Sequence, residues 1–216
     1  MSDLPRLWSF AASPFAGKAR VAFAEKGIEY ELLEVHPAKR PPRLKELNPL
    51  GRVPVLEVEG ALPMRESSVI CDYLEETCPE PALWPADPAA RAWARAWAKY
   101  VDDGIAVNFF LGMRKLAFGR DADDPEDITE RLHVIVPRQY PRLEDALGVH
   151  DGPWLCGEQF TYADVAGMAA AVRIPQWAPQ LAPDPAERPR VAAWMDALRA
   201  RPSAAAIEAK GTPVEA

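Results

Sequence analysis

Cysteine and histidine are scarce in this sequence, which has three of each among its 216 residues. Cys71, Cys78 and Cys156 form none of the CxxC pairs from which zinc and dithiol sites are built. The histidines are dispersed as well, without an HExxH motif or another paired-ligand spacing. We therefore expect reduced thiols and no metal site.

Long hydrophobic runs are also missing. The longest stretch free of charged and strongly polar residues runs from 165 to 172, whereas a membrane-spanning helix needs roughly 20 residues. Residues 1–6 do not show the charged start and apolar stretch of a secretory signal. The sequence therefore predicts a cytoplasmic protein with no membrane partner.

Positive charge is in deficit, because 25 Lys and Arg face 32 Asp and Glu, for a formal net charge of −7. Nucleic acid is not expected as the main partner, since phosphate binding needs a basic surface. An anionic small molecule would have to be held by a local group of arginines and lysines.

Apolar residues, at 49% of the chain, suffice for a sizeable core, and the pattern changes near residue 80. Before that point strand and helix signals alternate. Ser13 and Pro14 take the N-cap and first position of a helix that ends at Gly27. The expected elements are a strand at 6–10, a helix at 13–27, a strand at 30–35, at most a short helix within 39–47, a hairpin at 53–58 and 61–64, and a helix from 66.

Four prolines between residues 79 and 88 form a stiff connection typical of a domain boundary. Beyond it only helix signals are found: an N-cap at Asp87, a helix near 126–147 that Pro137 and Pro141 should divide, and a capping box at 161–164. The sequence predicts a thioredoxin-like α/β domain (β-α-β-α-β-β-α) at 1–80, a linker at 81–88 and an all-α domain at 89–216.

Four segments carry a resemblance to a known family. They are Ser13-Pro14-Phe15-Ala16, the run from Asn48 to Leu56, the helix start at 66–70, and the capping box. Together they resemble the cytosolic glutathione transferases over nearly the whole chain, with an omega-like, bacterial N-terminal motif in which serine replaces cysteine. The resemblance implies a glutathione-binding first domain, an electrophile pocket between the domains, and a homodimer.

The resemblance also implies roles for individual residues. Val53-Pro54 would be a cis peptide, with the backbone of Val53 pairing with the cysteinyl part of glutathione. Glu66 and Ser67, at a helix N-terminus that favours anions, would hold the γ-glutamyl end. Taken alone, Pro54 could be an edge-strand proline and the 66–67 pair a plain helix start.

A basic residue is expected to bind the glycyl carboxylate of glutathione. Arg40 fits the family pattern, Lys39 or Arg52 could replace it, and the alternative is a solvated basic loop. Phe15, beside Ser13, is a further candidate for contact with glutathione or the electrophile.

Ser13 is the candidate catalytic residue. A thiol with a pKa of about 8.5 is only a few per cent ionised at neutral pH, and lowering the pKa by about two units needs roughly 2.7 kcal/mol. A serine hydroxyl at a helix N-terminus could supply this. Alternatively Ser13 only caps the helix and backbone N–H groups stabilise the thiolate; Ser9 is a weaker candidate.

The chemistry is less constrained. Serine cannot form a mixed disulfide, which disfavours thiol-transferase activity and leaves conjugation, peroxide reduction and dehalogenation open. Two alternatives to a transferase are a non-catalytic regulator like the stringent-starvation proteins and a glutathione-binding module with incidental activity. The candidates for the electrophile pocket, each of which could instead belong to the core, are Tyr100, Asn108, Phe109, Arg114 and Trp177.

Overall fold

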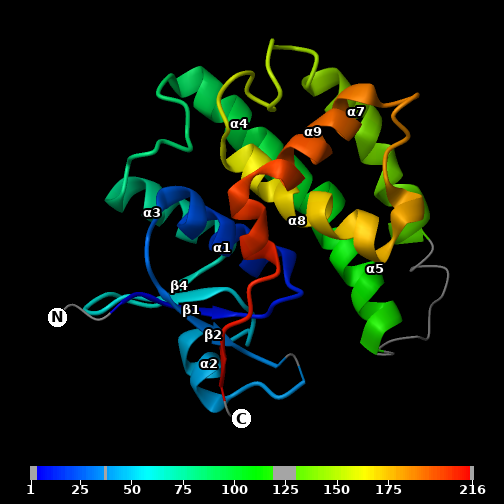
Figure 1. The fold of residues 1–216 in the computed structure, drawn as a ribbon. Helices are drawn as coiled ribbons and strands as arrows, with labels where there is room; N and C mark the ends of the chain where they lie inside the picture. The colour runs from blue at the N-terminus through cyan, green and yellow to red at the C-terminus, as the bar shows by residue number, and fades with distance from the viewer. Residues whose placement is uncertain (1–3, 37, 119–129, 215–216) are drawn as a thin grey trace. The chain divides into compact units, whose positions relative to one another are not determined.

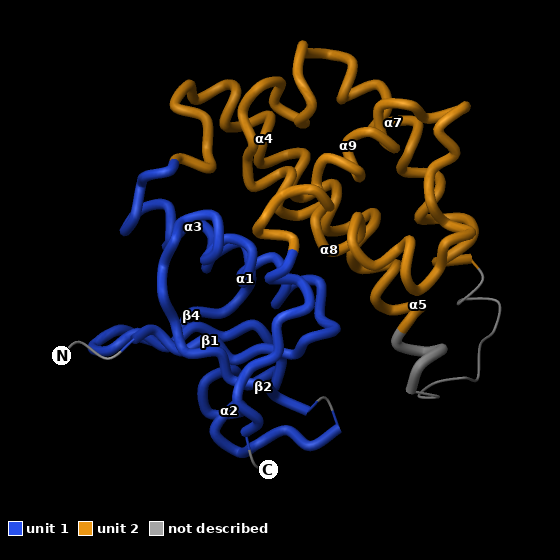
Figure 2. The backbone as a smooth tube through the Cα atoms, in the orientation of Figure 1, with its two compact units in different colours: residues 1–81, 205–216 blue, residues 82–204 orange. Residues whose placement is uncertain are grey.

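The computed structural model describes residues 4–36, 38–118 and 130–214, with side chains described outside 114–118. The chain forms two compact units (Figures 1 and 2). Unit 1 comprises residues 1–81 and 205–216, and unit 2 comprises residues 82–204.

Unit 1 is built on a five-stranded sheet in the order β4-β3-β1-β2-β5. β1 pairs in parallel with β2 and antiparallel with β3, as expected for a thioredoxin-like domain. The elements are β1 (Arg6–Ser9), α1 (Pro14–Lys26), β2 (Glu31–Glu34), α2 (Pro42–Leu47), β3 (Val55–Glu57), β4 (Met64–Arg65), α3 (Ser67–Thr77) and β5 (Thr212–Pro213).

The two faces of the sheet are covered by different helices. Leu44 and Leu47 of α2 pack with Trp8 and Val55 in one buried cluster. Helices α1 and α3 pack against each other and cover the opposite face (Figure 1). This two-sided burial is typical of a sheet with parallel strands.

Local chemistry explains where α1 begins and ends. The Ser13 side chain accepts a hydrogen bond from the N–H of Ala16, and Pro14 follows at the first helical position. Gly27 ends the helix in the left-handed region, at φ 63°, where glycine has no steric penalty. The predicted boundaries of this helix are confirmed.

Strand β5 corrects the prediction that no strand lies beyond residue 88. It pairs in parallel with β2, and its segment belongs to unit 1 rather than to the helical unit. A β-carbon on Gly211 would lie 2.2 Å from the Leu32 carbonyl oxygen, so only glycine allows this close approach. A two-residue strand is too short for periodicity to reveal, because it depends on pairing with a distant part of the chain.

The regular secondary structure in the described part of unit 2 is helical, apart from isolated bridges. Its central helix α8 is buried from Tyr162 to Ile174 and packs against α4 and α9. The predicted helix at 126–147 is divided as expected, although residues 126–129 lie outside the described part. The helical segments are α4 (Pro88–Val101), η1 (Asp102–Ala106), α5 (Val107–Phe118), η2 (Glu130–Ile135), η3 (Pro137–Gln139), α7 (Tyr140–Ala146), α8 (Tyr162–Trp177), η4 (Pro179–Leu181) and α9 (Pro189–Ala200). A last segment, η5 (Pro202–Ile207), leads from unit 2 into unit 1.

Candidate functional site

Sheet register brings three of the predicted segments to one end of unit 1. Trp8 of β1 lies opposite Val55 of β3, and Val55 lies opposite Arg65 of β4. The turn that follows β1, the residues that precede β3 and the residues that follow β4 therefore meet at the same sheet end. These are the segments that contain Ser13, Val53 and Glu66.

Ser13 is buried, with 4% of its surface exposed. Its Oγ accepts the Ala16 N–H at 3.2 Å, and its own N–H donates to the carbonyl of Phe10 at 2.9 Å. Within the described part of the chain, no acceptor is found for the hydroxyl hydrogen of Ser13. The side chain thus caps α1 with a lone pair and keeps its hydrogen available to an anion. Ser9, the weaker candidate, instead accepts from Arg20 at 2.5 Å.

Val53 precedes Pro54 in a cis peptide bond, as the resemblance implies. Val53 is half-buried. Among the described residues, neither the N–H nor the C=O of Val53 takes part in a backbone hydrogen bond. Both groups are therefore available to an extended peptide, the pairing known as strand addition.

The N-terminus of α3 follows a residue with positive φ and lies next to a buried lysine. Glu66 adopts φ 70°, a left-handed conformation that costs about 1–3 kcal/mol for a residue other than glycine and is found mostly at functional sites. Ser67, the first helical residue, is 5% exposed. The ammonium of Lys18, 3% exposed, donates to Ser68 Oγ at 3.0 Å. The N-terminal end of the helix favours an anion.

Lys18 was not among the residues singled out from the sequence. It lies on α1, and its only sequence-level signal is its position five residues after Ser13, where a lysine on a helix is ordinarily solvated. Its burial becomes evident only when α1 and α3 are seen packed together.

The basic candidates for the glycyl carboxylate are exposed. The Nη1 atom of Arg40 lies 3.4 Å from where a β-carbon of Gly51 would stand, so its guanidinium covers the turn just before Val53. Arg52 and Lys39 are also exposed. Arg40 is the basic side chain that these contacts bring toward the cis-proline segment. Phe15 is half-buried on the first turn of α1.

The electrophile-pocket candidates all belong to unit 2, and a ring contact joins two of them. Phe109 and Trp177 stack with ring centroids 6.3 Å apart. Asn108 has a structural role, because its side-chain amide donates to the carbonyls of Asp103 and Gly104.

The remaining two candidates are not joined to the stacked pair by any described contact. The ring of Tyr100 packs edge-on against Trp97 at 5.0 Å, and no partner is found for its buried hydroxyl oxygen in the described residues. The side chain of Arg114 lies outside the described part of the chain.

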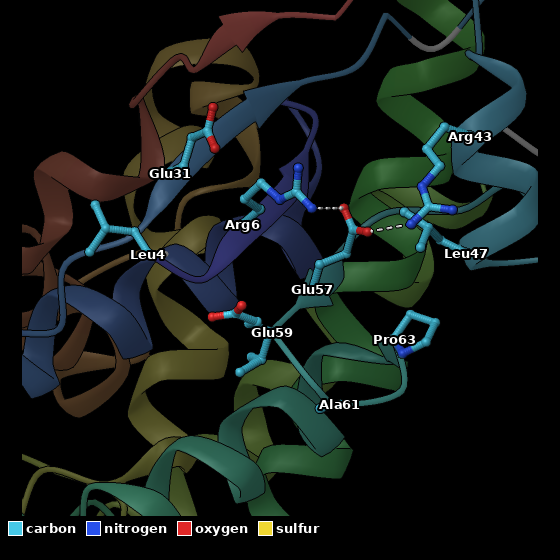
Figure 3. A pocket seen from close by; sticks show the side chains of 10 residues that line it. Leu4, Arg6, Glu31, Arg43, Leu47, Glu57, Glu59, Ala61 and Pro63 are labelled. Carbon is cyan, nitrogen blue, oxygen red and sulfur yellow. Dashed lines mark hydrogen bonds and ion pairs between the residues drawn. The ribbon is translucent and has the colours of Figure 1, made fainter. Parts of the chain in front are cut away.

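A cavity of about 750 Å³ lies at the opposite end of the unit 1 sheet (Figure 3). Arg6, at the start of β1, and Arg43 both bind Glu57, whose carboxylate also accepts the Trp8 indole N–H at 2.6 Å. Burial raises the pKa of Glu57. The hydrogen bonds from Trp8 and Arg43 and the charges of both arginines lower it by more, so the pKa lies below its usual value. The arginines in this cavity already face a carboxylate, so we do not assign them a ligand.

None of the helices in the described ranges is long and apolar enough to cross a bilayer. No group of three or more histidine, cysteine, aspartate or glutamate side chains suited to a metal ion occurs in the same ranges.

Comparison with known proteins gives a consistent result. Models described as "Glutathione S-transferase, N-terminal domain" and "Glutathione S-transferase, C-terminal domain" match residues 7–82 and 108–202. A probable glutathione S-transferase from Glycine max is 31% identical over 170 residues, which cover 79% of this chain and 71% of the relative.

Solved structures agree with the sequence matches. Glutathione transferase Omega 3C from Trametes versicolor superposes with a TM-score of 0.76 and 28% identity, covering 98% of this chain and 87% of that one. A theta class enzyme from Xanthomonas axonopodis pv. citri, solved with glutathione bound, gives a TM-score of 0.78 and 28% identity over 94% of this chain and 96% of its own.

Proposed function

Because the chain belongs to the glutathione S-transferase family, we propose that it binds glutathione at the Ser13 end of the unit 1 sheet and that Ser13 activates the thiol. The observation that carries this proposal is the state of the Ser13 side chain. It is buried, it caps α1 through its oxygen, and its hydroxyl hydrogen has no acceptor in the described part of the chain.

Activation follows from ordinary electrostatics. A hydroxyl donating to sulfur, at the positive end of a helix of 13 residues, favours the thiolate over the thiol. Together these interactions need to supply roughly 2.7 kcal/mol to lower the thiol pKa by about two units. The thiolate then forms a carbon–sulfur bond with an electrophile, whose leaving group departs with the bonding electron pair or whose multiple bond accepts it.

The remaining candidates orient the tripeptide. We assign the N–H and C=O of Val53 to the cysteinyl residue, Ser67 and the N-terminus of α3 to the γ-glutamyl carboxylate, and Glu66 to its ammonium. Lys18 supports this helix start through its hydrogen bond to Ser68 Oγ. Arg40 is assigned to the glycyl carboxylate, since its guanidinium covers the turn before Val53.

Serine at position 13 also limits the reaction class. With no sulfur on the protein at this place, the reacting thiol comes from glutathione, which favours conjugation over thiol transfer. A non-catalytic regulator on the same fold is not favoured, because it would have no need of this full set of groups.

The test is the pKa of the thiol of glutathione bound to the enzyme, followed by thiolate absorbance. Ser13→Ala should raise it by about one to two units and lower kcat at neutral pH by roughly tenfold or more. Ser13→Thr keeps a hydroxyl and should retain most of the effect. Both variants first need to be retained on immobilised glutathione.

If Ser13→Ala binds glutathione with an unchanged thiol pKa and turnover, then Ser13 only caps the helix and backbone N–H groups stabilise the thiolate. Failure of the unaltered protein to bind immobilised glutathione would reject the glutathione site as a whole.

We further propose a cytoplasmic homodimer in which residues 1–81 and 205–216 form the glutathione domain and residues 82–204 the helical domain. Light scattering that gives a single-chain mass would reject the dimer.

A further inference from the structure

Arg20 is completely buried on α1, seven residues after Ser13. Each of its donor nitrogens has protein acceptors. Nε donates to the carbonyl of Ala206 at 2.7 Å, Nη1 to Ser9 Oγ at 2.5 Å and to the Phe10 carbonyl at 3.4 Å, and Nη2 to the carbonyls of Ala11 and Ile207 at 3.0 and 2.8 Å. A guanidinium has five N–H donors, so this set uses them all.

Three of those bonds hold the turn that leads from β1 to Ser13. The carbonyl of Phe10 is held from two sides, since it also accepts the N–H of Ser13 at 2.9 Å. Arg20 and Ser13, the residue assigned to thiol activation, therefore donate to the same carbonyl oxygen.

Glu34 binds the same turn through a negatively charged group. Its Oε1 accepts the N–H of Ala11 at 2.7 Å, so Ala11 is bound to a guanidinium through its carbonyl and to a carboxylate through its amide. Hydrogen bonds to ionised groups are roughly twice as strong as those between neutral groups. The turn has little freedom to move while both groups are present.

The end of the chain completes this arrangement. The carbonyls of Ala206 and Ile207 accept from Arg20, and the N–H of Val214 donates to the carbonyl of Glu34 at 3.0 Å. Residues 206–214 thus bind the guanidinium of Arg20 and the backbone of Glu34, although the helical unit separates them from the turn in sequence.

We propose that Arg20 and Glu34 are positioning residues for thiol activation: they fix the turn 9–12, and through it the Ser13 hydroxyl, with residues 206–214 as the second support of both. This inference rests on the proposed role of Ser13. Neither side chain is proposed to touch glutathione, so their loss should impair ionisation of the thiol more than binding of the tripeptide.

Two variants of the full chain test this. Arg20→Lys keeps a positive charge but has three donors on one atom, which cannot serve acceptors on both the turn and residues 206–207. Glu34→Ala removes the acceptor of the Ala11 N–H. Each should raise the pKa of the bound glutathione thiol by about half to one unit, while the Kd for glutathione changes less than about threefold.

A second buried cation on the same helix provides the matched control. Lys26, 7% exposed, donates to the carbonyls of Cys78, Pro79 and Pro81 and pairs with Glu75, all away from the turn. Lys26→Met should lower stability but leave the thiol pKa where it is. An unchanged thiol pKa in Arg20→Lys, or an equal rise in Lys26→Met, would overturn the inference.

Combination with Ser13→Ala separates this inference from the proposed function. If Arg20 acts through Ser13, adding Arg20→Lys to Ser13→Ala should raise the thiol pKa no further, whereas independent effects would add. If Ser13→Ala alone leaves the thiol pKa unchanged, the proposed function fails. If Ser13→Ala raises it and the Arg20 and Glu34 variants do not, only the positioning role fails.

Discussion

Glu57 is a single carboxylate that joins Trp8, Arg6 and Arg43 at the cavity end of the sheet. Because its pKa in the folded protein is lowered, its contribution is present above the unfolded pKa of about 4.3 and is lost as the pH falls below it. Glu57→Gln should therefore cost about 1 kcal/mol at pH 7 and less near pH 3. Urea unfolding at the two pH values measures this.

Glu59 offers a control for Glu57, since it lines the same cavity as an exposed carboxylate. Glu59→Gln should change the free energy of unfolding by less than about 0.5 kcal/mol at both pH values. A deficit of Glu57→Gln that persists undiminished at low pH would show that its charge is not what stabilises the sheet end.

At the scale of an element, α8 depends on one side chain at its start. Asp164 is fully buried and accepts hydrogen bonds from the N–H groups of Leu155 and Thr161, the Thr161 hydroxyl and the Trp194 indole. Burial raises its pKa, whereas these donors lower it. Asp164→Ala removes a helix cap and leaves buried donors unpaired, so unfolding should become easier by about 4 kcal/mol.

The control for Asp164 lies on the neighbouring helix α9. Asp196 is exposed and pairs with Arg199 within the same helix. Asp196→Ala should cost less than about 0.5 kcal/mol, as is usual for surface ion pairs. Thermal or urea unfolding that finds similar losses for the two aspartates would contradict the importance given to the buried cap.

The other end of α8 contains a proline within the helix. Pro175 has no N–H, so the carbonyl of Ala171 loses its helical partner, and Arg199 donates to that carbonyl at 3.1 Å instead. Arg199→Met should cost about 1 kcal/mol in the natural chain and less in a Pro175→Ala background, where residue 175 regains its donor. A double-mutant cycle measures the difference, and strict additivity would rule out the compensation.

For the whole molecule, the return of the chain to unit 1 depends on Gly211. A side chain there would meet the Leu32 backbone oxygen, which cannot move aside as a side chain could. Gly211→Ala should cost about 2 kcal/mol and speed hydrogen exchange at the Val214 amide by about tenfold or more. Lys210→Ala, an exposed neighbour, should do neither; if both variants exchange alike, β5 is not a stable part of the sheet.

Sequence predicted those parts of the fold that have local causes. The N-caps at Ser13 and Asp87 and the capping box at Thr161 are set by neighbouring residues, and all are found in the structure. Strand β5 was missed because it exists only through contact with β2, nearly 180 residues earlier in the chain.

The site divides in the same way. Motifs identified Ser13, Val53 and Glu66, and strand register brings their segments together. The buried cations Lys18 and Arg20 could not be assigned roles, because a basic residue on a helix is usually solvated and only the packed unit shows which groups it meets. The state of the Ser13 hydroxyl likewise depends on the full set of neighbours.

The two segments that form unit 1 are synthesised at different times, because one lies at each end of the chain. Unit 1 includes residues 205–216, so a ribosome must translate the whole helical unit before the last strand of the first sheet becomes available. Until then the β2 edge is open and Arg20 lacks two of its five acceptors. The nascent segment 1–81 therefore reaches its final form only after the rest of the chain has emerged, and the turn that carries Ser13 is completed among the last.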